Sequence, residues 1–122
     1  MRLLPTAALA TFFRDPWVHY PYGFAMFVLC GVAISFVAFL PAGDAVPLHY
    51  NVYFGIDYLG DMATALRLPL VGGIFVIMNA TVAWLVWQHK QSLARFLALG
   101  TVAVTIIIAL SASLTLSINL AT

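Results

Sequence analysis

Charged residues are what this sequence has least of. They make up 7% of the 122 residues, against roughly 25% in soluble domains, while 64% of the chain is hydrophobic. This composition excludes a water-soluble globular protein. Five lysines and arginines nearly balance four aspartates, which leaves a formal charge of +1. Because nucleic-acid binding needs many phosphate-neutralising cations, we expect no nucleic-acid partner.

Cysteine is equally scarce, since Cys30 is the only one. A single thiol in an apolar run excludes a disulfide framework and a thiolate metal cluster. The sequence also contains no nucleophile–base pair, phosphate-binding loop or dinucleotide fingerprint. His19 and His89 could together ligate a haem or a metal, but without a third ligand we favour imidazoles among interfacial aromatics. We therefore predict no enzymatic activity and no cofactor.

The few charges leave three long charge-free windows, at residues 16–43, 68–89 and 96–122. Each can cross a hydrocarbon layer of about 30 Å as a helix rising about 1.5 Å per residue. Backbone groups in lipid have no water to bond, so each crossing segment must be helical. We predict an all-α membrane protein, one domain over residues 1–122, with transmembrane helices at 17–40, 68–88 and 92–120.

Two further segments lie outside these spans. Residues 41–67 are expected to form a structured extracytoplasmic loop between the first and second helices. Asp15-Pro16 and Pro21 are expected to bend the chain into the first helix. Residues 1–16 predict a short interfacial helix that places six residues in the headgroup boundary: Leu3, Leu4, Ala7, Ala8, Phe12 and Phe13.

The cations near the ends of the spans indicate the orientation. Arg2 and Arg14 precede the first helix, and Lys90 and Arg95 flank the turn between the second and third. By the positive-inside rule, the N-terminus lies in the cytoplasm and the C-terminus outside. An aromatic belt is expected at the cytoplasmic interface, formed by Trp17, Tyr20, Tyr22, Trp84 and Trp87.

Small residues recur along all three predicted helices. Lipid is as apolar as leucine, so helices in a membrane associate largely through close approach at small residues. We interpret these positions as packing seams, within the bundle or between protomers; a polar conduction path along the third helix is the alternative. The predicted packing residues are Gly31, Ser35, Gly72, Gly73, Asn79, Ala80, Ala83, Thr101, Thr105, Ala109, Ser113 and Ser117.

Asn79 lies near the middle of the second predicted helix. An unpaired amide in hydrocarbon costs several kcal/mol, so this side chain needs a partner. We expect a hydrogen bond to a hydroxyl of the third helix, Thr105 or Ser111 by depth. Binding of a substrate or ion is the less favoured alternative, because no charged residue accompanies it.

The predicted outer loop is dense in aromatic and turn residues. Residues 49–54 read as an extended stretch, and Gly55 permits a turn. Gly60 and Asp61 are expected to start a short amphipathic helix with Asp61 as its cap, while Pro69 suits the first turn of the second spanning helix.

Within this loop, Pro47, His49 and Asn51 form Pro-x-His-x-Asn, and Gly55 and Asp57 form Gly-x-Asp. This pattern resembles the signature of an uncharacterised bacterial membrane-domain family, which also stands at the front of SdpI-type immunity proteins. The resemblance covers the first helix through the start of the second. It implies a protein of the bacterial cytoplasmic membrane without catalytic activity. An immunity role is not carried over, because the chain lacks the later helices of those proteins.

His49, Asp57 and Asp61 are also the candidate ligands of a metal, since a histidine with two carboxylates is a recognised donor set. The favoured interpretation is structural, with His49 and Asn51 bonding the loop backbone and both aspartates capping turns.

For function, we expect a scaffold or interaction subunit of a homo- or hetero-oligomeric membrane assembly. Its partners would be the lipid bilayer and either a second copy or a larger membrane protein. One alternative is an oligomeric pore or small-solute channel lined by the third helix, and another is a metal or ligand site in the outer loop.

Overall fold

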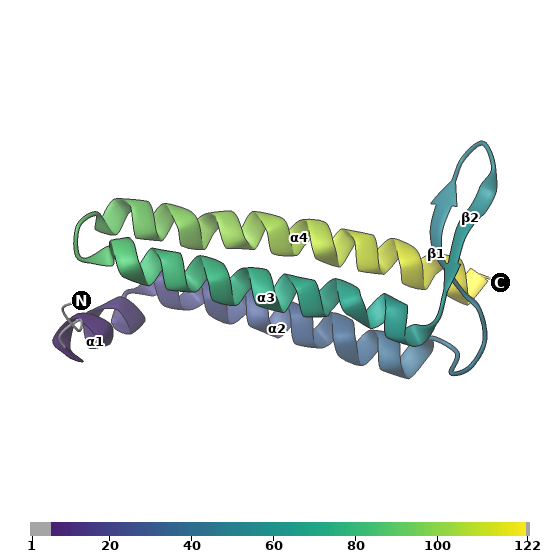
Figure 1. Cartoon of the computed structure of the whole chain (residues 1–122), viewed down its shortest axis with the longest axis horizontal. Helices are drawn as coiled ribbons and strands as arrows, with labels where there is room; N and C mark the ends of the chain where they lie inside the picture. The colour runs from purple at the N-terminus through teal and green to yellow at the C-terminus, as the bar shows by residue number, and fades with distance from the viewer. Residues whose placement is uncertain (1–5, 122) are drawn as a thin grey trace.

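The computed structural model describes residues 6–121, so Leu3 and Leu4 of the predicted interfacial segment lie outside it. Three long helices run side by side, with a short helix at one end and a hairpin at the other (Figure 1). In chain order the elements are α1 (Thr6–Arg14), α2 (Pro16–Phe39), β1 (Val46–Asn51), β2 (Gly55–Gly60), α3 (Met62–Trp87) and α4 (Gln91–Ala121).

The three long helices confirm the main prediction from the charge distribution. Each of α2, α3 and α4 is long and apolar enough to cross a membrane. At about 1.5 Å per residue they reach roughly 36, 39 and 46 Å, against a hydrocarbon thickness of about 30 Å.

One predicted helix start is wrong, and one expected bend is absent, both at prolines. The second long helix begins at Met62, so the expected short amphipathic helix is its first turns and Pro69 lies inside it. The first begins at Pro16, so Pro21 is also internal and the chain breaks only at Asp15. In each case an aspartate cap at the residue before the helix sets the start.

The helices meet along residues spaced alternately three and four apart, the repeat of a coiled-coil seam. In α4 these are Ala94, Ala98, Thr101, Thr105, Ala112 and Thr115. The predicted ladder of every fourth residue is therefore correct only at its start, and Ser113 and Ser117 are exposed. A step of four turns a helix by about 400°, so the face drifts roughly 160° between Thr101 and Ser117.

Of the three glycines predicted to pack, only one lies at a close contact with other described residues. Gly72 of α3 is buried, and a Cβ added there would lie 2.8 Å from side-chain atoms of both Leu29 and Ile108. Gly31 was predicted to pack but is exposed, and no described atom lies within 4 Å of a Cβ added there or at Gly73. Ala83 is buried, whereas Ser35, Ala80 and Ala109 are half-buried.

Asn79 finds its partner on α4, as expected, but not the one expected. Its amide donates to the Thr101 hydroxyl and, at 2.8 Å, to the Leu97 carbonyl oxygen. Thr105 and Ser111 lie farther along α4, and the Thr105 hydroxyl bonds the Thr101 carbonyl instead. The antiparallel turn at residues 88–90 places Asn79 closer to the start of α4 than the depth comparison suggested.

The chain is mostly helical, but a two-stranded antiparallel sheet departs from the all-α prediction. β1 pairs with β2 from Val46↔Gly60 to Asn51↔Gly55, with irregularities on both sides of His49. Gly55 has a positive φ of 76° at the turn. The base of this hairpin packs on the helices through buried Val46 and half-buried Leu48, and the Asn119 amide donates to the Pro47 carbonyl oxygen at 2.8 Å.

The contact at Gly72 gives a first prediction. Gly72→Leu should lower the free energy of unfolding by about 1–3 kcal/mol, because a larger side chain must displace Leu29 and Ile108. Gly100→Leu is the matched control, since no described atom lies within 4 Å of its Cβ position. Thermal unfolding in detergent measures both. Equal melting temperatures for the two variants would contradict the close approach.

Candidate functional site

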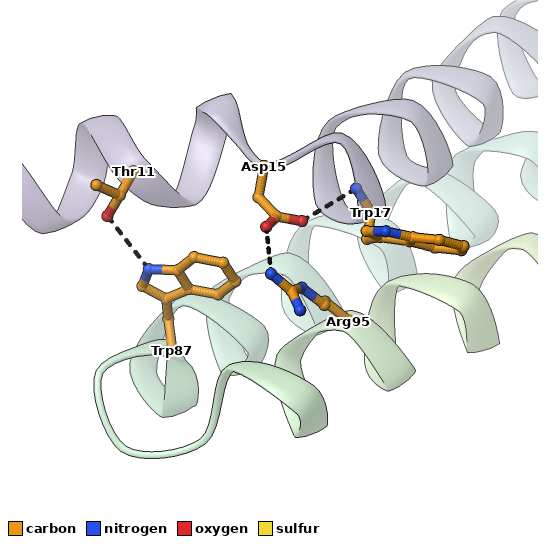
Figure 2. A network of polar contacts seen from close by, with 5 residues as sticks. All are labelled: Thr11, Asp15, Trp17, Trp87 and Arg95. Atoms are coloured by element: carbon orange, nitrogen blue, oxygen red, sulfur yellow. Dashed lines mark hydrogen bonds and ion pairs between the residues drawn. The ribbon is translucent and has the colours of Figure 1, made fainter.

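At the end of the bundle where α1 lies, a polar network joins all four helices (Figure 2). Asp15 stands between α1 and α2 with its side chain 12% exposed. One carboxylate oxygen accepts from the Trp17 backbone N–H at 3.0 Å and caps α2, while the other pairs with the Arg95 guanidinium at 2.7 Å. A single carboxylate therefore starts α2 and ties it to α4.

Trp87, at the end of α3, completes this network. Its ring is 4% exposed, and the indole N–H donates to the Thr11 hydroxyl at 3.3 Å. The Arg95 guanidinium lies 5.9 Å from the ring centroid, a cation–π distance. Phe12 meets the indole edge-on at 5.5 Å between centroids. α1 is thus fixed against α3.

Two predictions for this end need correction. Phe12 was placed in the headgroup boundary, but it is 1% exposed and packs inside the bundle, whereas Phe13 is 59% exposed. Trp87 was assigned to an aromatic belt and is instead buried. Trp17 and Tyr20 are exposed at 59% and 71%, as residues of a belt must be. α1 has only 9 residues, too few for the spacing of its apolar side chains to reveal which phenylalanine faces α3.

At the opposite end, the hairpin brings together two of the three candidate metal ligands. His49 Nδ1 lies 2.6 Å from Asp57 Oδ1, with the two side chains 65% and 36% exposed. This contact contradicts the expectation that His49 bonds the backbone and Asp57 caps a turn. Asn51 does bond the backbone, accepting from the Tyr53 N–H at 2.9 Å.

Asp61, the third candidate ligand, instead caps the N-terminus of α3, as predicted. Its carboxylate accepts from the Thr64 hydroxyl and from the Thr64 backbone N–H, the latter at 2.7 Å. These two hydrogen bonds hold the pKa of Asp61 below its usual range. Within residues 6–121, no three histidine, cysteine or acidic side chains gather closely enough to hold a metal.

A groove of about 340 Å³ separates α2 from α3 on the outside of the bundle. Three small residues line it, Cys30 and Ala33 from α2 and Gly73 from α3, among larger apolar side chains such as Met26 and Ile77. Cys30 is exposed in this groove. Sequence reasoning named Gly73 as a packing residue but did not separate it from Gly72, which sits 100° away around the same helix.

Comparison with protein families, curated proteins and solved structures finds no match to this chain. The resemblance of residues 47–57 to a bacterial membrane-domain family therefore stays a prediction.

The Asp15 network gives a second prediction. Asp15→Asn keeps an oxygen to cap α2 but loses the ion pair, and should cost about 1 kcal/mol of unfolding free energy, since Arg95 is partly exposed. Asp15→Ala loses both contacts and should cost about 2 kcal/mol. Unfolding in mixed micelles measures the values, with exposed Asp44→Asn as the control. Equal costs for the asparagine and alanine variants would contradict the capping role.

A third prediction concerns pH at the start of α3. Because the folded pKa of Asp61 is lowered, the cap stabilises α3 above the usual aspartate pKa and is lost as pH falls through the lowered value. The Thr64 amide resonance should therefore titrate with a midpoint below the ordinary aspartate pKa. NMR of the labelled protein measures the midpoint, and Asp61→Asn should abolish the transition. A midpoint in the ordinary aspartate range would contradict the two hydrogen bonds.

Proposed function

We propose that this protein is a non-catalytic interaction subunit of the bacterial cytoplasmic membrane, which pairs with a second copy through the groove between α2 and α3. The three long helices span the bilayer in this proposal. The α1 end carries Arg14, Lys90 and Arg95 against one carboxylate, Asp15. The hairpin end carries three aspartates against one arginine. This distribution favours the N-terminus inside and the C-terminus outside.

The observation that carries the proposal is the unfilled groove between α2 and α3, whose lining includes three small residues. Gly73 and Ala33 leave room for another backbone to approach, and no described atom lies within 4 Å of the Gly73 Cβ position. Close approach at small residues is the main way that helices associate in lipid. Only about a fifth of the residues in each apolar stretch are buried, so most of the bundle surface must be covered by lipid or by another chain.

A pore lined by α4 receives less support. Thr101 and Thr105 are at most 1% exposed, and their hydroxyls donate to carbonyl oxygens one turn back, at 3.2 and 2.8 Å. The exposed side of α4 is mostly aliphatic, with Ile107 and Leu110 more than 60% exposed. The hydroxyls of exposed Ser113 and Ser117 also donate to carbonyl oxygens one turn back. A water-filled path needs polar groups on that outer side.

Cys30 gives the fourth prediction. A symmetric pair places equivalent residues near each other at its axis, so oxidation with copper-phenanthroline in membranes should form a Cys30 disulfide dimer. Gly73→Leu fills the groove and should lower the yield of dimer several-fold. The matched Gly100→Leu, also without neighbours at its Cβ position, should leave the yield unchanged.

A second cysteine position separates a specific pair from random collision. Leu110 on α4 is 61% exposed but does not line the groove between α2 and α3. Leu110→Cys in a Cys30→Ser background should therefore crosslink poorly, although the new thiol is as open to random collision. Single-molecule photobleaching of labelled protein in bilayers reports the copy number directly. One bleaching step together with no Cys30 dimer, or equal yields from Gly73→Leu and wild type, would overturn the proposal.

A further inference from the structure

A second groove lies on the outside of the bundle between the first turns of α2 and the start of α4. It holds about 550 Å³, and aromatic side chains form one wall. Trp17, Tyr20 and Phe24 are spaced three and four apart on α2, so they share one face of that helix. Leu99 and Val102 form the opposite wall on α4.

The length of the groove suits an acyl chain. From Trp17 to Phe24 the wall extends about 10 Å along the helix, two thirds of one leaflet of a bilayer about 30 Å thick. Its lining is almost entirely apolar, and Trp17, Tyr20 and Phe24 are 59%, 71% and 46% exposed. A second helix would find no small residue among these aromatic side chains, which distinguishes this groove from the one that holds Gly73.

Charge is concentrated where the groove ends. Arg95 precedes Leu99 by one turn on the same face of α4, and its guanidinium pairs with Asp15, which caps the helix that carries Trp17 (Figure 2). Arg14 and Lys90 are exposed at this same end of the bundle, and Asp15 is the one carboxylate there among residues 6–121. An apolar groove that opens onto excess positive charge matches an amphiphile with an anionic head.

We propose that this groove binds an anionic phospholipid, with an acyl chain along Trp17, Tyr20 and Phe24 and its phosphate near Arg95, Arg14 and Lys90. The proposal rests on the membrane insertion assumed in the proposed function. Basic residues near a membrane surface each favour anionic lipid, and the excess of two cations predicts roughly thirtyfold preference over zwitterionic lipid.

Quenching of Trp17 fluorescence tests the proposal. The full chain is reconstituted in nanodiscs with increasing brominated phosphatidylglycerol or brominated phosphatidylcholine, and the Trp17→Phe variant supplies the signal of Trp84 and Trp87 for subtraction. The Trp17 component should be half quenched at roughly thirtyfold lower mole fraction of the phosphatidylglycerol. Equal quenching by the two lipids, or none by either, overturns the proposal.

Two pairs of variants assign the preference to this groove. Arg14→Gln with Lys90→Gln should reduce it several-fold, whereas Arg67→Gln at the hairpin end should not. Val102→Phe narrows the groove and should weaken quenching, while Ile106→Phe, one turn beyond on exposed α4 surface, should leave it unchanged. An unchanged preference in the double glutamine variant, or unchanged quenching in Val102→Phe, overturns the assignment.

Vesicle flotation separates this proposal from the one on which it rests. Protein that resists carbonate extraction and floats, yet shows equal quenching, contradicts the lipid site alone. Protein that is extracted by carbonate contradicts membrane insertion and, with it, both proposals.

Discussion

The long helices turn most of their bulky apolar side chains outward and meet largely through small ones, with Leu29 and Phe36 among the larger residues buried between them. Ala25, Ala83, Ala94 and Ala98 are fully buried, whereas Phe27 is 79% exposed. A bundle in water would reverse this arrangement, because burial of large apolar side chains drives association there. In lipid that drive is absent, and close contact between backbones takes its place. The close packing around Gly72 depends on this contact between backbones, because a larger residue there would meet Leu29 and Ile108.

Small-residue seams let helices slide, so the polar contacts at the two ends of the bundle set their alignment. At one end Asp15 pairs with Arg95 while it caps α2. At the other, the Asn119 amide bonds the Pro47 carbonyl oxygen and attaches the hairpin to α4. Asn79 and Thr101 join α3 to α4 between them. Each contact links segments that are distant in sequence. Because these bonds are directional, they fix the alignment of the helices, which van der Waals contact along the seams cannot do.

Three helices were predictable from sequence because charge scarcity and backbone hydrogen bonding leave few alternatives. Asp61 was predictable as a cap because capping is local. The His49–Asp57 contact was not, since it depends on a strand register with irregularities on both sides of His49. The burial of Phe12 depends on Trp87, far along the chain. A repeat of four was mistaken for a seam because over a few turns it differs little from the true alternation of three and four.

The two outer grooves differ because α2 changes character along its length. Its first turns present Trp17, Tyr20 and Phe24 toward α4, where bulky rings keep another backbone away but contact a flexible chain well. Farther along, Cys30 and Ala33 line the groove beside α3, where their small side chains leave room for a helix of another chain. The two grooves lie at different depths and on different sides of α2, so one occupant does not exclude the other. A lipid held beside Arg95 would thus leave the Gly73 face open to a second copy of the chain.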